Sequence, residues 1–235
     1  MDSMEHSIRQ EHLTPVAELD VTSRSRFIAR TYLHLLGAIL LFVLLEVVLF
    51  TTGAAEGLLR IVVNTNWLLF LGAFMLIGWL ASRTAHNSAS RGMQYAALLG
   101  YVLAEALIFA PLLYIADAYA DGGVITSAAL VTTIAFAALT AVVFITRKDF
   151  SFLGGLLKWL GILALALIIA GIVFGFQLGT FFSVLMVGFA GAAVLYTTSN
   201  IIERYPEDRY IGAPLELFAS IALMFWYILR LFMRD

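Results

Sequence analysis

Long runs of apolar residues, separated by short polar links, dominate the chain. The hydrocarbon core of a bilayer is about 30 Å thick and takes roughly 20 apolar residues as a helix. Seven runs reach or approach that length, which predicts an all-α membrane protein built as a seven-transmembrane helix bundle. The predicted spans are residues 30–52, 67–82, 93–116, 124–146, 152–174, 178–200 and 211–233.

The polar segments are too short to form a second folded unit. Residues 1–28 are predicted to be a polar, cytoplasmic N-terminal tail, and residues 29–235 a single seven-helix transmembrane domain. The links at 121–123, 147–149 and 175–177 leave room only for turns. Helices that are consecutive in the sequence should therefore be antiparallel neighbours.

Basic residues are distributed unevenly between the two predicted sides of the membrane. If the N-terminus is cytoplasmic, that side carries eleven of the 14 lysines and arginines, and the outside carries Arg60, Arg230 and Arg234. The positive-inside rule therefore predicts a cytoplasmic N-terminus, and the expected location is the plasma (inner) membrane. The arginines at the end of the last segment leave open an alternative, in which this segment re-enters the membrane instead of spanning it.

The amino-acid composition indicates that the chain lies in a lipid bilayer. Apolar residues make up 62% and charged residues 13%, against about 45–50% and about 25% in soluble domains. A soluble fold of this size could not bury that much apolar surface. The formal net charge of −2 gives no reason to expect a nucleic-acid partner.

The sequence also lacks the residues that common membrane chemistries require. Cysteine is absent, which excludes disulfides and thiolate metal sites. Lys148 and Lys158 are the only lysines, so the last helix has none for a retinal Schiff base, and only His34 among the histidines lies in a span, whereas haem in membranes takes paired histidines. We therefore expect no enzyme activity, no catalytic residue, no metal site and no cofactor.

Acidic residues inside the predicted spans need an explanation, because a charge at the bilayer centre costs about 2.5–3.5 kcal/mol on insertion scales. Glu105 lies midway along the third span, six residues before Pro111, which is expected to kink the helix. It is either a cation or proton site facing the bundle interior, or a protonated or hydrogen-bonded structural residue. Glu46, near the outer end of the first span, is expected to extend its carboxylate to the interface.

Two further polar features lie near the cytoplasmic ends of the last two spans. The hydroxyl-rich run at 196–200 is expected to be a helix end that meets water. Glu216 opens the last helix, where an acid complements the helix dipole. It also shares a 4-3-4-3 spacing with Ser220, Leu223, Tyr227 and Arg230, so these side chains form one stripe that could face a polar interior.

Three motifs in the last two spans carry a family resemblance: AVLYTTSNII at 193–202, LELFAS at 215–220 and LRLF at 229–232. They resemble the Bax inhibitor-1 family, also called the transmembrane Bax inhibitor motif family, and its bacterial YccA-like branch in particular. A looser resemblance extends over residues 28–233. It implies six helices around a central seventh, a proton-sensitive calcium leak and, in bacteria, restraint of a membrane-bound AAA protease.

The resemblance also implies a pair of aspartates, one on each of the last two helices, that share a proton and gate the pore. Two carboxylates held close together cannot both ionise cheaply, which makes such sharing physically reasonable. This chain departs from the family at both positions, where it has Thr197 and Ser220. Arg230 matches a family arginine ten residues after the second aspartate, and Arg83 matches a basic residue near the end of the second helix.

Two functional hypotheses follow. The first is a multi-pass protein that passes or modulates a cation leak, with calcium as the candidate ion. The alternative is a non-conducting protein that binds and restrains a membrane AAA protease, which the missing aspartates favour. Calcium flux through the pure protein would separate the two. The candidate pathway and gating residues are Glu105, Thr197, Ser220, Glu216, Arg230 and Arg83.

Overall fold

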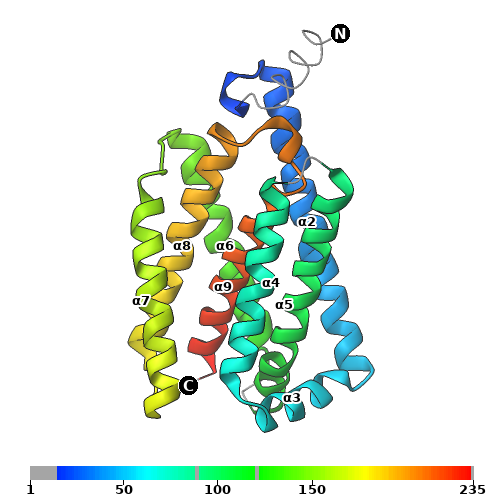
Figure 1. Cartoon of the computed structure of the whole chain (residues 1–235), viewed down its shortest axis with the longest axis vertical. Helices are drawn as coiled ribbons and strands as arrows, with labels where there is room; N and C mark the ends of the chain where they lie inside the picture. Colours follow the sequence, from blue (N-terminus) through cyan, green and yellow to red (C-terminus); the bar gives the residue numbers. More distant parts are fainter. Residues whose placement is uncertain (1–14, 88–89, 120–121, 234–235) are drawn as a thin grey trace.

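The computed structural model describes residues 15–87, 90–119 and 122–233, and its helices form one bundle (Figure 1). Seven helices of the described part are long and apolar enough to cross a membrane. This confirms the predicted multi-pass helical fold. The elements are η1 (Val16–Glu18), α2 (Val21–Thr51), α3 (Ala54–Asn64), α4 (Trp67–Asn87), α5 (Arg91–Tyr119), α6 (Val124–Thr146), α7 (Leu153–Phe174), α8 (Thr180–Glu203), η2 (Glu207–Arg209) and α9 (Ala213–Phe232).

The first two spans are longer than their apolar runs. Helix α2 begins at Val21 instead of residue 30, because the Asp20 carboxylate accepts a hydrogen bond from the Ser23 amide at 3.0 Å and caps the helix. Helix α4 continues to Asn87, beyond the predicted end at residue 82. Part of the predicted polar tail is therefore helical, and residues 1–14 of that tail lie outside the described residues.

Helix α3 was not predicted from the hydrophobic pattern. The chain leaves α2 through Gly53, whose φ of 76° is in the left-handed region that favours glycine. The 11-residue helix then carries an exposed ion pair between Arg60 and Glu56 at 2.6 Å. It packs against α2 and α5 and lies across the end of the bundle opposite to the start of α2 (Figure 1).

Helices α5 and α9 form much of the bundle interior. In their most apolar stretches 61% and 50% of the residues are buried, against 17% in α2, α6 and α7. Helix α9 packs against α2, α4, α5, α6 and α8. The central last helix that the family resemblance implies is therefore present, and α5 shares the interior with it.

Helix α9 crosses the whole bundle. Its 20 residues correspond to a length of about 30 Å, which matches the hydrocarbon core. It starts at the end of the bundle where α2 begins and finishes at the opposite end (Figure 1). This is the geometry of a full span, not of the re-entrant segment that the terminal arginines left open.

Close backbone contacts hold the start of α9 in place. The Val16 amide donates to the Tyr205 carbonyl at 2.9 Å, which ties η1 to the link between α8 and α9. At the same end, a Cβ atom on Gly212 would lie only 2.7 Å from the Ala85 carbonyl oxygen of α4. Because the two backbones approach so closely, the first turn of α9 cannot move closer to α4, and a side chain at Gly212 would not fit between them.

Candidate ion pathway around Glu105

Glu105 points from α5 toward the central helix and is only 4% exposed. Its helical neighbours Tyr101 and Phe109 contact α9: the Tyr101 ring lies 6.2 Å from Phe218, and the Phe109 ring lies 5.7 Å from Phe225. Residues four apart share one face of a helix. The Glu105 carboxyl group therefore faces α9 between these two aromatic contacts.

The surroundings of Glu105 provide one polar partner. The Tyr101 hydroxyl lies near its carboxyl group, and among the described residues Glu105 forms no ion pair. Helix α5 continues through Pro111 without a break. The nearby hydroxyl suits a structural carboxyl, whereas the missing counter-charge suits a site for a proton or a cation. Glu105 can therefore still be either a cation or proton site or a structural residue.

Thr197 and Ser220 are both buried, at 4% and 7% exposure. Helices α8 and α9 are antiparallel (Figure 1), and a Cβ on Gly191 would lie 4.0 Å from the Met224 methyl carbon. In that register Thr197 is level with the turn of α9 that holds Ser220. Ser220 also lies at the depth of Glu105, and its hydroxyl donates to the Glu216 carbonyl at 2.9 Å.

The hydroxyl-rich end of α8 is buried, although the sequence predicted that it meets water. Residues 197–200 are all at most 9% exposed, because η1, α2 and α9 cover this end of α8. The Tyr32 hydroxyl of α2 lies beside the hydroxyls of Thr140 and Thr198, and none of the three makes a well-formed hydrogen bond. They come from three helices distant in the sequence, so no local pattern could have revealed this cluster.

Glu46 is a second buried acid that the sequence analysis misplaced. It is 6% exposed, and neither carboxylate oxygen has a hydrogen-bond partner, so it does not reach the interface as predicted. Phe42 and Phe50, four residues on either side, contact aromatic rings of α5. Their spacing is the signal that would have placed Glu46 on the protein-facing side of α2.

Comparison with known proteins agrees with this architecture. A family model described as "Inhibitor of apoptosis-promoting Bax1" matches residues 24–235. The chain belongs to the Bax inhibitor-1 family. Bax inhibitor 1 from Oryza sativa subsp. japonica is 30% identical over 190 residues, which are 78% of this chain and 74% of that protein.

Other relatives of this Bax inhibitor-1 family protein come from a plant and a virus. Protein LIFEGUARD 4 from Arabidopsis thaliana is 36% identical over 123 residues, 49% of each chain. The Golgi anti-apoptotic protein of Vaccinia virus (strain Lister) is 28% identical over 169 residues, 70% of this chain and 68% of that protein. The chain spans about half the length of LIFEGUARD 4 and of a Pseudomonas aeruginosa relative.

The basic candidates of this Bax inhibitor-1 family protein lie away from the two hydroxyl positions. Arg83 lies over the Trp79 ring at 5.1 Å, on the exposed side of α4. Arg230 is in the last turn of α9, about 15 Å along the helix from Ser220. Tyr227, on the same predicted stripe, packs against Phe182, so an aromatic contact separates Arg230 from the polar residues at the start of α9.

Glu216 lies at that polar start and is half-buried. The Tyr205 hydroxyl donates to its carboxylate at 2.8 Å. Burial and the nearby Glu216 charge together raise the pKa of Tyr205 well above its ordinary value. This hydroxyl therefore stays protonated and keeps donating at physiological pH.

The described residues hold no group of three or more His, Cys, Asp or Glu side chains placed to share a metal ion. Single carboxyl groups are the acidic features of the interior.

Proposed function

We propose that this Bax inhibitor-1 family protein is a non-enzymatic membrane protein that passes or modulates a cation leak, with calcium as the ion and Glu105 as the acid on its route. The single observation that carries the proposal is the buried Glu105 carboxyl, which faces the central helix without a counter-charge. Such a group costs several kcal/mol in a bilayer. A cation or a proton that occupies the site would offset this cost.

Neutral oxygens near the same depth support a cation route. Ser220 lies at the depth of Glu105. The buried Thr198 hydroxyl lies beside Tyr32 and Thr140, nearer the end of the bundle where α2 begins. Hydroxyl oxygens can replace part of the hydration shell of an ion, and one carboxylate supplies the charge. A succession of single weak sites favours passage over tight binding.

Glu105→Gln should lower calcium entry into liposomes that contain the pure protein and a calcium dye. Glutamine keeps the size and the polarity of the side chain but removes its charge. We expect a fall on the order of tenfold, which corresponds to about 1.4 kcal/mol of lost ion stabilisation. Glu56→Gln on the exposed helix α3 is the matched control and should leave the flux unchanged. Equal flux in Glu105→Gln and the natural protein would remove Glu105 from the mechanism.

The second candidate function is a non-conducting protein that restrains a membrane AAA protease. The observation in its favour is that Thr197 and Ser220 replace the two aspartates that the family resemblance implies. This function expects no calcium flux from the pure protein at any pH, together with co-purification of an AAA protease from native membranes. Flux without such co-purification would reject it.

We further propose a plasma (inner) membrane location with the N-terminus in the cytoplasm, and the eleven-to-three distribution of basic residues supports this orientation. The link between α6 and α7, which holds Lys148, lies at the end of the bundle where α2 begins, and the link between α5 and α6, which holds Gly122, lies at the opposite end (Figure 1). In this cysteine-free chain, an impermeant thiol reagent on whole cells should label Gly122→Cys and leave Lys148→Cys unlabelled. The reverse pattern would invert the orientation.

A further inference from the structure

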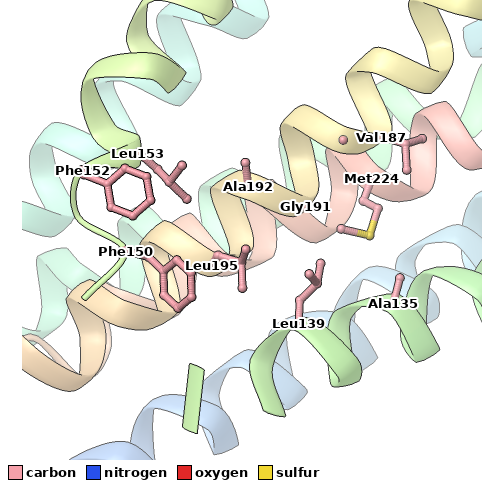
Figure 2. A pocket seen from close by; sticks show the side chains of 11 residues that line it. Ala135, Leu139, Phe150, Phe152, Leu153, Val187, Gly191, Ala192, Leu195 and Met224 are labelled. Atoms are coloured by element: carbon pink, nitrogen blue, oxygen red, sulfur yellow. The ribbon is translucent and has the colours of Figure 1, made fainter. Parts of the chain in front are cut away.

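An open apolar cavity lies between α6, α7 and α8, with α9 beneath it (Figure 2). Its volume is about 450 Å³, within the roughly 300–1,000 Å³ that small-molecule sites occupy. The walls are almost entirely carbon. Leu139 comes from α6, Leu153 from α7, Ala192 and Leu195 from α8, and Met224 from α9.

Small residues on α8 create the space. A Cβ atom on Gly188 would meet nothing within 4 Å, so this part of α8 faces open volume. One turn on, a Cβ on Gly191 would lie 3.3 Å from Leu139, so α6 closes against α8 there. The cavity is therefore a wedge that the bundle leaves unfilled, and not a packed contact between helices.

The position of the cavity favours an acyl chain over water. Its α6, α8 and α9 walls belong to membrane-spanning helices. An apolar cavity offers water too few hydrogen-bond partners to hold it. Within a bilayer the abundant apolar molecule is lipid, and an acyl chain can enter the wedge without desolvating any polar group.

Two unpaired cations lie beside one end of the cavity. Phe150 and Phe152 line that end, and Arg147 and Lys148 precede them in the same link, both exposed. Within the described part of the chain, neither basic side chain has a hydrogen bond or ion pair. Both basic residues thus belong to the same short link as the aromatic residues that line this end of the cavity.

The link that carries these cations is fixed by its neighbours. The Phe150 amide donates to the Ser199 hydroxyl at 3.0 Å. Arg204 binds Asp149 at 3.1 Å and the Ser151 hydroxyl at 2.7 Å, so the one acid of the link is already neutralised. Hydrogen bonds from Ser151, with the Arg204 charge, lower the pKa of Asp149 and keep it ionised for this role.

We propose that this cavity binds one acyl chain of an anionic glycerophospholipid, whose phosphate is held by Arg147 and Lys148. Basic residues above a space between transmembrane helices are a recurring site for anionic head groups. A docked helix from another protein would fill the apolar wedge but would leave the two cations without a counter-charge. Charge complementarity therefore selects the lipid.

The test is native mass spectrometry of the purified full chain with equal amounts of phosphatidylglycerol and phosphatidylcholine of the same acyl composition. The natural protein should retain phosphatidylglycerol preferentially. Arg147→Gln with Lys148→Gln should lose this preference by roughly thirty-fold, as expected for two basic residues at an anionic membrane surface. Arg24→Gln with Arg26→Gln, on α2, is the charge-matched control and should keep it.

A second pair of variants tests the cavity itself. Gly188→Leu projects into the open volume and should abolish retention of both lipids, while Gly37→Leu, equally open but on α2, should not. Thermal unfolding in detergent establishes that each variant is folded. A preference that survives loss of Arg147 and Lys148, or lipid retention unchanged by Gly188→Leu, would overturn the proposal. So would a bound protein or second copy that Gly188→Leu releases, because it would assign the wedge to a helix partner.

Discussion

Gly212→Ala should destabilise the folded protein by about 1–3 kcal/mol, the usual cost of forcing a methyl group into a filled space. The added Cβ would lie 2.7 Å from the Ala85 carbonyl oxygen and 3.2 Å from the Ala85 Cβ. Both contacts involve atoms that no rotamer change can move. Gly212 has a φ of −79°, so alanine suits its backbone and the loss would come from the clash alone. Gly212→Leu should prevent folding.

Thermal unfolding in detergent measures the effect. A chain of this size loses about 2–4 °C of Tm for each kcal/mol, on the scale established for soluble proteins. Gly100→Ala is the matched control: its Cβ meets nothing within 4 Å, and alanine favours the helix by about 1 kcal/mol. It should therefore leave the Tm equal or higher. Equal Tm values for Gly212→Ala and the natural protein would mean that α4 and α9 are not held in this contact.

Cation flux through the natural protein should show no step between pH 5 and 8, whereas Thr197→Asp with Ser220→Asp should create one. The two hydroxyls do not titrate in this range. Two carboxyl groups at the same depth would share one proton and release it as a unit. One proton limits the change to about tenfold per pH unit.

The matched control is Thr197→Asn with Ser220→Asn, because the amides have the shape of the carboxyl groups but do not ionise. Its flux should stay flat across the same pH range. A step in the natural protein that Glu105→Gln abolishes would place the proton sensor on α5. A step that survives Glu105→Gln would contradict the placement of the titrating groups altogether.

The sequence alone was sufficient to predict that these segments are membrane-spanning helices, although not where every helix begins and ends. A run such as 124–146 or 152–174 is too apolar for water, and in lipid its backbone must satisfy its own hydrogen bonds, which a helix does. The structure places helices at Val124–Thr146 and Leu153–Phe174. Where helices continue into polar residues, as at the start of α2, hydropathy carries no signal, and a capping side chain sets the boundary instead.

The candidate site was only partly accessible from the sequence. An acid such as Glu105 stands out in an apolar run because the free-energy cost of placing its charge inside a bilayer arises whatever the fold. The direction in which an acid points does depend on the fold: Glu46 is buried because aromatic residues on either side of it pack onto α5. The Tyr32, Thr140 and Thr198 cluster exists only once three helices have assembled.

The sequence by itself therefore determined that the chain crosses a membrane as helices, how many crossings it makes and which family it resembles. Only the tertiary structure decided that α5 shares the interior with α9, that the end of α8 is covered and that a wedge remains beside Gly188. The physical reason is that lipid tails and protein interiors are equally apolar. Hydropathy then cannot tell a lipid-facing side chain from a buried one, and close packing between particular helices makes that choice.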